Sequence, residues 1–291
     1  MNYLIILLFI SNVFAQDDLL SLLEEEVVKS PVFASFKGTR VVNAQSLELP
    51  GNKILQFMIQ HRFGSIQNGF YDLYGLDYAN VRFDLQYGYT PNFSFGIGRS
   101  TVKKTYDIFF KAKVLKQMSD NSIPISIVIF SNSGINTKRK SSEDLAVNNL
   151  FINRMSYLNQ LIIGRKFNRS FSLEILPTII HKNLVVDDSA SNSLYSFGVG
   201  WRYKFSKRLS INMEYFEPLG ERNSGFINAW GVGFDIETGG HVFQIMLTNA
   251  QGAYEGAYIE EANGTLSKKN LYLGFNISRA FSYLNSDSGK W

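Results

Sequence analysis

The sequence predicts an all-β protein, a closed antiparallel up-and-down transmembrane β-barrel of about 12 strands with a short helical or irregular arm at its N-terminus. Three observations predict this fold class. Aromatic residues make up 14% of the 291 residues, whereas charged residues make up only 19%, below the roughly 25% of a soluble domain. Apolar and polar residues alternate over about twelve segments. The connections between these segments alternate between short and long, as they do at the two ends of an outer-membrane barrel.

Composition also excludes several classes of protein. The chain has no cysteine, so a disulfide scaffold, a cysteine-ligated zinc site and a thiol nucleophile are excluded. The net charge is +4, and no dense run of Lys and Arg stands out. We therefore expect no nucleic-acid partner.

The N-terminus predicts export. An apolar run from Tyr3 to Ile10 is followed by Val13-Phe14-Ala15, which is typical of a signal peptide over residues 1–15 that is cleaved after Ala15. A buried N-terminal strand is the alternative. Since no other stretch approaches 18 apolar residues, we expect no transmembrane helix. The expected location is the outer membrane of a Gram-negative bacterium.

Residues 16–52 are expected to form a periplasmic arm or a plug in the barrel lumen. Within them, residues 17–28 combine leucines with Glu24, Glu25 and Glu26, as in a short acidic amphipathic helix or a mobile arm. Such a segment could supply a plug that lies against Lys111, Lys113, Arg202 and Lys204. A further short strand is expected around residues 39–42. Residues 53–281 would form the barrel, and residues 282–291 a polar tail.

The barrel strands are read from the alternation. They are expected at 53–63, 79–89, 93–101, 105–117, 123–137, 155–167, 171–183, 195–205, 209–216, 228–238, 241–249 and 269–281. Segment 155–167 alternates poorly, because Leu161, Ile162 and Ile163 are consecutive, and Pro177 removes one ladder hydrogen bond from segment 171–183. Either feature could mark a bulge or a shift of register.

The two faces of these segments distinguish a barrel from a soluble β-sandwich. In 195–205, bulky residues such as Phe197 and Trp201 alternate with small or charged ones such as Gly200 and Arg202. Glycine is unusual on a sandwich surface but suits the curved inner wall of a barrel. Segments of about 11 residues also match the apolar band of an outer membrane, whereas sandwich strands are usually about half as long.

Aromatic residues fall where the membrane boundaries are expected. One group flanks the tight turns and would form a ring at the periplasmic side: Tyr89, Phe93, Phe167, Phe171 and Phe205. The other group falls at the opposite strand ends: Tyr106, Tyr157, Tyr195 and Tyr215. Two such rings are typical of barrels anchored between lipid headgroups.

Four short motifs carry a family resemblance. They are 61–65 (HRFGS), 74–77 (YGLD), 104–107 (KTYD) and 236–244 (IETGGHVFQ). They are similar to segments of an outer-membrane β-barrel family of Bacteroidota, a domain of unknown function, and the likeness runs from about Phe36 to Phe281. The resemblance implies an outer-membrane barrel and assigns no catalytic or binding residue.

The residues indicate no catalytic or metal site. The three histidines, His61, His181 and His241, are spread over different strands, so a shared metal is not expected. His61 and Ser65 invite comparison with a twelve-stranded outer-membrane phospholipase, but four strand residues separate them by roughly 13 Å, beyond the reach of a nucleophile–base pair. We expect no enzymatic activity, no cofactor and no metal.

The lumen is the remaining candidate site. Its predicted charged lining carries both signs: Arg82, Asp84, Asp107, Lys111, Lys113, Glu174, Arg202, Lys204, Glu214, Asp235 and Glu237. Eight-stranded barrels are filled by side chains and sixteen-stranded ones leave a channel, so twelve strands leave two functions open. We favour a narrow pore or small-solute transporter. The alternative is a closed structural barrel whose outer loops bind a partner or belong to an outer-membrane assembly.

The expected partners follow from this location. They are the lipid of the outer membrane, the barrel assembly machinery during insertion, and a protein partner at the outer loops or the N-terminal arm. The last strand, ending at Phe281, carries the Gly and aromatic pattern of an insertion signal.

The export prediction is testable. The mature protein should begin at Gln16, fractionate with the outer membrane and migrate faster on gels when it is not boiled. N-terminal sequencing and membrane fractionation measure this. Recovery in the soluble periplasm would contradict the barrel architecture itself.

Overall fold

The structure is a computed structural model, which describes residues 29–139, 150–185, 191–220, 225–238 and 240–282. The predicted signal peptide, the acidic segment 17–28 and residues 283–291 of the predicted tail lie outside the described residues.

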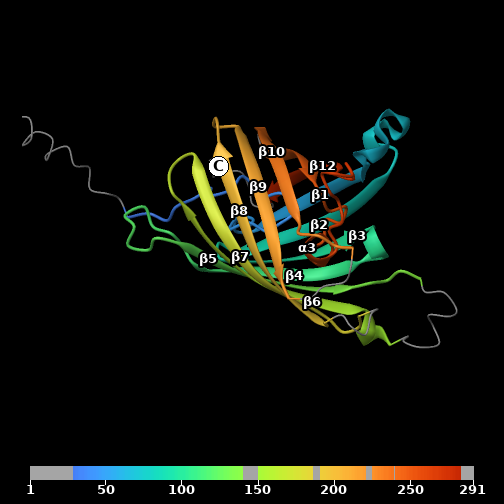
Figure 1. The fold of residues 1–291 in the computed structure, drawn as a ribbon. Coiled ribbons are helices and arrows are strands. Elements are labelled where there is room, and N and C mark those ends of the chain that lie inside the picture. The colour runs from blue at the N-terminus through green and yellow to red at the C-terminus, as the bar shows by residue number, and fades with distance from the viewer. Residues whose placement is uncertain (1–28, 140–149, 186–190, 221–224, 239, 283–291) are drawn as a thin grey trace, which may run out of the picture.

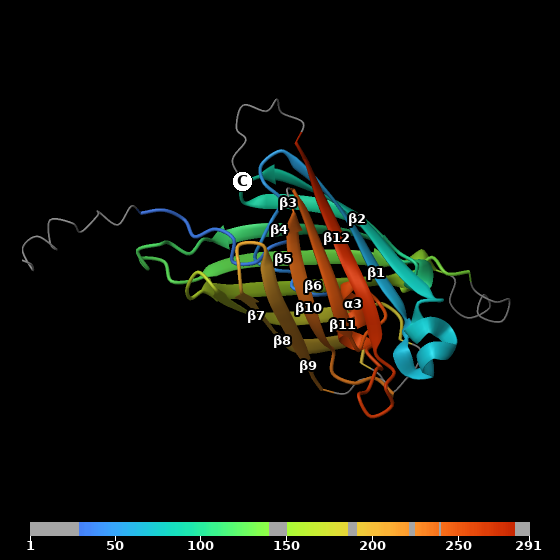
Figure 2. The same cartoon turned by 90° about the horizontal axis from the view of Figure 1, so that it is seen from above.

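The described strands form one closed antiparallel barrel (Figures 1 and 2). Each strand pairs with its sequence neighbours, and β1 pairs with β12 to close the ring. The strands are β1 (Ile54–Ser65), β2 (Ala79–Thr90), β3 (Phe93–Ser100), β4 (Tyr106–Leu115), β5 (Ser126–Ile135), β6 (Met155–Lys166), β7 (Phe171–Lys182), β8 (Ser193–Lys204), β9 (Leu209–Leu219), β10 (Trp230–Thr238), β11 (His241–Thr248) and β12 (Tyr272–Ser282). The predicted fold class is confirmed.

Each strand overlaps one predicted segment. The largest difference lies between β4 and β5, where residues 116–125 form a longer connection than the predicted 118–122. Pro177 causes no bulge: the pairs Gln160–Thr178 and Ile163–Ile175 on either side of it have the same register. The proline therefore costs ladder hydrogen bonding without displacing the strand.

The two ends of the barrel differ. At one end the strands are joined mostly by tight turns, and we call it the short-turn end. The opposite, long-loop end carries three 3-10 segments, η1 (Ile66–Gly75), η2 (Val102–Lys104) and η3 (Phe151–Arg154). It also carries the β11–β12 connection, which contains the helix α3 (Glu255–Glu260). Because the η2 connection is short, the barrel wall at β3 and β4 extends less far at the long-loop end.

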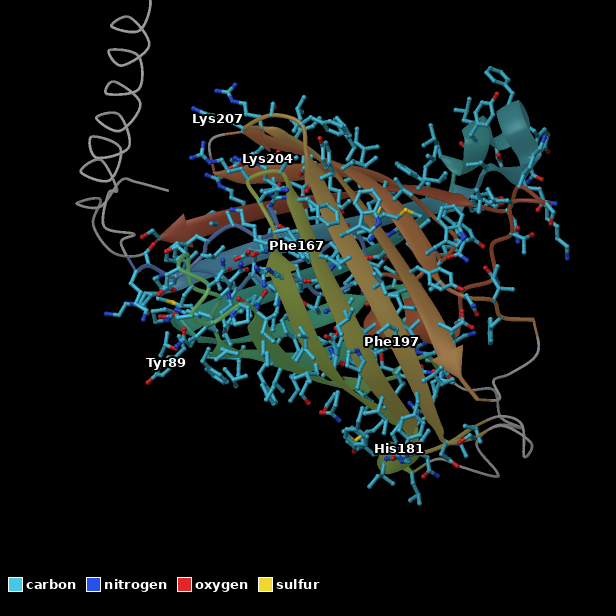
Figure 3. The ribbon with its side chains drawn as sticks, turned by 60° about the vertical axis from the view of Figure 1, so that its left-hand side comes forward. Tyr89, Phe167, His181, Phe197, Lys204 and Lys207 are labelled. Atoms are coloured by element: carbon cyan, nitrogen blue, oxygen red, sulfur yellow. The ribbon has the colours of Figure 1, made fainter. Side chains whose placement is uncertain are left out.

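The outward face of the wall is apolar, with aromatic rings near both ends. Tyr89 and Phe167 lie toward the short-turn end, whereas Phe197 and His181 lie toward the long-loop end (Figure 3). Three outward arginines sit over aromatic rings: Arg99 over Tyr106, Arg165 over Phe167 and Arg279 over Phe281. Such cation–π contacts let a charged side chain remain at the edge of an apolar band.

The inward face is divided into two regions. On β1–β4 and β8–β12 it is largely polar. On β4–β9 it carries a group of buried apolar side chains: Phe109, Val128, Phe130, Leu158, Ile162, Leu176, Ile180, Leu194 and Phe216. Alternation alone predicted apolar residues on the outward face. The consecutive Leu161, Ile162 and Ile163 were the signal that β6 is apolar on both faces.

The facing assignment can be tested at the middle of β10, where Phe234 is an exposed outward residue. Phe234→Lys should lower the free energy of unfolding by about 2–4 kcal/mol, the cost of a cation at the membrane midplane. Urea unfolding in lipid vesicles measures it. Phe234→Leu is the control and should cost far less; equal tolerance of both variants would show that Phe234 does not face lipid.

Candidate functional site: the barrel lumen

Residues 36–48, here called the lumen segment, lie inside the barrel. The chain approaches from the short-turn end, where Val32 N donates to Gln117 O at 2.8 Å. The blue trace then runs within the ring of strands (Figures 1 and 2). Phe36, Val41, Val42 and Leu47 are at most 2% exposed.

The lumen segment forms a tight hairpin rather than a strand of the wall. Arg40 and Gln45 are bridged, and Val41 N donates to Ala44 O at 2.9 Å. Because the hairpin pairs only with itself across this bridge, the backbone groups at its tip need other partners. The extra strand expected around residues 39–42 is one arm of this hairpin.

Glu214 of β9 satisfies the tip of the hairpin. Its carboxylate accepts from the backbone N–H groups of Val42 (3.1 Å), Asn43 (2.9 Å) and Ala44 (2.9 Å). It also accepts from Asn43 Nδ2 at 2.8 Å. Four donors converge on one buried carboxylate, which is how a charge is accommodated away from water.

Other inward side chains bind the backbone of the lumen segment in the same way. Lys111 Nζ donates to Ser46 O (2.7 Å) and Glu48 O (2.6 Å), and Glu174 accepts from Leu47 N (3.1 Å). Gln244 and Asn276 donate to the carbonyl oxygens of residues 41 and 42 at 2.6 and 2.9 Å. The wall therefore recognises main-chain groups of the segment, whereas the side chains of Phe36, Val41, Val42, Ala44 and Leu47 join the buried apolar cluster of the inner wall.

The α3 loop, residues 250–264, enters the lumen from the long-loop end. Its Glu255 is fully buried and accepts from Arg40 Nη1 (2.5 Å) and Gln45 Nε2 (2.8 Å) of the lumen segment. The two inserted segments thus meet near the middle of the barrel. Tyr258 packs on Phe216 with ring centroids 5.5 Å apart, within the apolar region of the inner wall.

Ion pairs fasten the α3 loop at the barrel mouth. Glu261 accepts from Lys103 at 2.5 Å and Lys182 at 3.1 Å, and Lys182 also pairs with Glu260 at 2.8 Å. Burial alone would raise the pKa of the Glu261 carboxyl, but the two ammonium groups hold it below its usual range. Burial raises the pKa of the Tyr258 phenol, and the nearby carboxylates of Glu255 and Glu214 raise it further.

Inward glycines make room for the inserted segments. A Cβ at Gly164 would lie 2.7 Å from Leu47, at Gly231 3.0 Å from Val42, and at Gly134 2.6 Å from Tyr254 Oη. Real Cβ atoms rarely come so close to another group. The space beside each of these glycines is therefore filled by the inserted segments of the chain itself. A cavity of about 20 Å³ between Arg40, Asp235 and Asn276 is roughly the space of one water.

The structure brings together only some of the charged residues predicted from sequence. Arg82 forms a buried ion pair with Asp107 and lies 3.6 Å from Asp84. Asp235 accepts from Ser210, Asn212 and Gln244.

Others among them lie apart at the short-turn end. Arg202 is buried there, and neither its Nε nor its Nη1 has a hydrogen-bond partner among the described residues. Glu237 pairs with Lys37. Lys113 and Lys204 are partly exposed at the same end.

Several central residues were missed by sequence reasoning. Arg40 and Asn43 precede the barrel, and Glu255 and Tyr258 lie in a long outer loop, so no strand pattern marks them. The residues 17–28 that were expected to face Lys111 and Arg202 lie outside the described residues. It is the backbone of residues 46 and 48 that reaches Lys111.

The histidines belong to the outer wall. His61 stacks on Phe275 at 4.8 Å, His181 contacts Ser193 Oγ at 2.8 Å, and His241 stacks on Phe243. Across the ranges that the structure describes, no group of three or more His, Asp or Glu could hold a metal ion. In those same ranges no helix is long and apolar enough to cross a membrane.

A closed barrel with an apolar outer face and a polar-lined lumen defines an integral membrane β-barrel. The chain belongs to the family described as "Membrane bound beta barrel domain (DUF5777)", which matches residues 36–281. This confirms the resemblance to a barrel domain of unknown function.

Several solved structures are similar in fold. The NanC porin is 11% identical with a TM-score of 0.49, covering 79% of this chain and 100% of that one. The KdgM porin is 8% identical with a TM-score of 0.47, covering 79% and 99%. The Acinetobacter baumannii outer membrane protein Omp33 is 10% identical with a TM-score of 0.43, covering 81% and 100%. No curated protein is significantly similar to the chain.

The role of Glu214 can be tested. Glu214→Ala leaves three buried N–H groups of the hairpin without an acceptor, so it should lower the free energy of unfolding by at least about 2 kcal/mol. Glu237→Ala removes a carboxylate whose side chain is 47% exposed and should cost less than about 1 kcal/mol. Urea titration of the refolded barrel measures both. Equal costs would contradict the role of Glu214 in holding the hairpin.

Proposed function

We propose that the protein is an outer-membrane channel for small polar solutes, closed at rest by its own lumen segment. The signal peptide expected from the sequence and the two aromatic rings support the outer membrane as its location. In that membrane the short-turn end would be periplasmic, so the lumen segment would enter from the periplasm.

The observation that carries the proposal is the chemistry of the contact between the lumen segment and the wall. Glu214, Lys111, Glu174, Gln244 and Asn276 bind main-chain groups of the segment. Water can satisfy each of these side chains when the segment leaves, so the wall does not need the segment to keep its polar groups hydrogen-bonded.

The α3 loop differs because it connects β11 to β12 and is therefore held by the wall at both of its ends. Tyr258, Ile259 and Ala262 are buried in the apolar region of the wall, and Lys103 and Lys182 hold the loop at the mouth. We infer that it remains in place and narrows the pore when the lumen segment moves. The open path would run along β8–β12 and β1, and it would be lined by charges of both signs. Such a lining suits small polar or zwitterionic solutes more than large or apolar ones.

One observation favours the second candidate, a closed barrel that binds a partner through its outer loops. The segment η1 projects from the long-loop end (Figure 1), and its Phe70 and Tyr71 are 78% and 92% exposed. Exposed aromatic residues of this kind are typical of protein interfaces.

A reversible lock tests the channel. A Cβ at Gly231 would lie 3.0 Å from Val42 Cγ1, and one further bond adds about 1.5 Å. The two Cβ atoms are thus within the roughly 4.5 Å that a disulfide spans. We expect the oxidised Val42→Cys, Gly231→Cys variant to be silent in planar bilayers. Reduction should restore openings, and deletion of residues 16–52 should give steady conductance.

The chain has no cysteine of its own, so the engineered bridge is unambiguous. Gly231→Cys alone is the control for the changed wall and should behave identically under oxidising and reducing conditions. Heat-dependent gel mobility shows whether each variant is folded. If a folded deletion variant does not conduct, the channel is wrong and the partner-binding barrel is the better proposal.

A further inference from the structure

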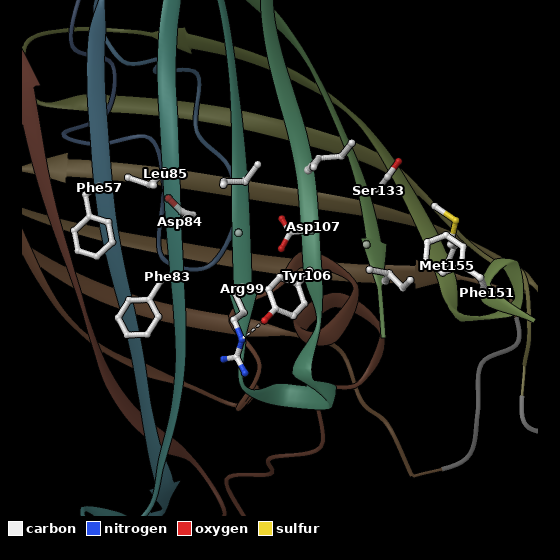
Figure 4. A pocket seen from close by; sticks show the side chains of 15 residues that line it. Phe57, Phe83, Asp84, Leu85, Arg99, Tyr106, Asp107, Ser133, Phe151 and Met155 are labelled. Carbon is white, nitrogen blue, oxygen red and sulfur yellow. Dashed lines mark hydrogen bonds between the residues drawn. The ribbon is translucent and has the colours of Figure 1, made fainter. Parts of the chain in front are cut away.

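The outer wall carries an apolar groove of about 480 Å³ across β1–β6 (Figure 4). Its floor includes the backbone at Gly98 and Gly134, two inward positions between the outward side chains that line the groove. Phe57 and Phe83 border one side, and Phe151 and Met155 border the other: all of these residues line the groove. Within it, Ile97 and Ile108 are 58% and 64% exposed. The groove faces the apolar phase of the membrane, so a hydrocarbon chain suits it.

One end of the groove is basic. Arg99 lines the groove beside Tyr106, and its Nε donates to Tyr106 Oη at 3.0 Å (Figure 4). The guanidinium carbon lies 5.4 Å from the centre of the Tyr106 ring. These contacts fix the orientation of the guanidinium. Among the described residues, neither Nη1 nor Nη2 forms a hydrogen bond or an ion pair, so four N–H donors are available in a planar fork.

The position of Arg99 calls for a counter-ion. The apolar band of such a barrel is about 25 Å tall. Arg99 is the cross-strand partner of Tyr106, which belongs to the predicted outer aromatic ring, so it lies at the headgroup edge of this band, where a lipid phosphate is within reach.

The other two outward arginines differ. Arg165 donates to Asn121 at 3.0 Å and stacks on Phe167, and Arg279 stacks on Phe281. Both lie near the short-turn end, and neither lines the groove. Lys104, in contrast, is exposed in the η2 connection directly after β3 and adds positive charge at the same edge of the wall as Arg99.

We propose that this groove is a binding site for a phosphate-bearing, acylated lipid of the leaflet at the long-loop end. One acyl chain lies along Ile97 and Ile108, and the phosphate accepts a two-point hydrogen bond from Nη1 and Nη2 of Arg99. A phosphate is the group that matches a guanidinium fork in both charge and geometry. The low wall at β3, β4 and η2 lets the headgroup reach this depth. The site is independent of whether the lumen conducts.

Native mass spectrometry of the full chain in detergent tests the site, with dioleoyl phosphatidic acid as the probe. We expect one tightly bound molecule on the wild type. Arg99→Gln should weaken binding about tenfold, the factor that corresponds to 1.4 kcal/mol. Arg279→Gln removes a matched arginine outside the groove and should change binding less than twofold.

Two further experiments distinguish the contribution of the lipid headgroup from that of the acyl chain. Dioleoylglycerol, which lacks the phosphate, should bind at least about tenfold more weakly, and inorganic phosphate should not compete with the lipid. Ile108→Trp fills the groove with an apolar side chain and should reduce occupancy, whereas Ile245→Trp on β11 should not. Equal binding by the Arg99→Gln and Arg279→Gln variants, or equal effects of the two tryptophans, would overturn the proposal. Heat-dependent gel mobility confirms that each variant is folded.

Discussion

The pairing of β1 with β12 is the constraint on which the rest of the structure depends. A lipid-exposed sheet edge would leave a row of N–H and C=O groups without partners, and no water is present in the apolar phase to satisfy them. Closing the ring removes that edge. Once the ring is closed, alternation places every second residue inside. The closed ring then encloses a lumen, which must be filled by side chains and backbone or by water.

The protein fills that interior with its own chain from both ends. The lumen segment contributes backbone groups, which inward polar side chains such as Glu214 and Lys111 bind. The α3 loop contributes Tyr258, which the apolar inner wall of β4–β9 covers. Arg40 and Glu255 join the two. The attachment of the α3 loop to β11 and β12 and its ion pairs at the mouth are the physical basis for assigning permanence to that loop and movement to the lumen segment.

The outer face obeys the opposite rule, because lipid is its solvent. Its few charges are placed where an aromatic ring or a polar neighbour moderates their cost, as in Arg165 and Arg279. Arg99 is moderated in the same way by Tyr106, but it also lines an apolar groove on the wall. The inner and outer faces of the same strand, β3, thus serve different partners: the lumen on one side and the membrane on the other.

The sequence by itself determined the barrel, its strands and the inside–outside assignment of residues such as Phe234 and Asp235, because strand alternation and loop asymmetry are local patterns. It did not reveal the hairpin at residues 39–46 or the burial of Glu255, because neither lies in an alternating segment. It also left the inward glycines ambiguous between open space and close packing. Only the tertiary structure decided that Gly164 and Gly231 face Leu47 and Val42, because this depends on which distant segment enters the ring. No local pattern encodes contacts between residues about 120 to 190 positions apart.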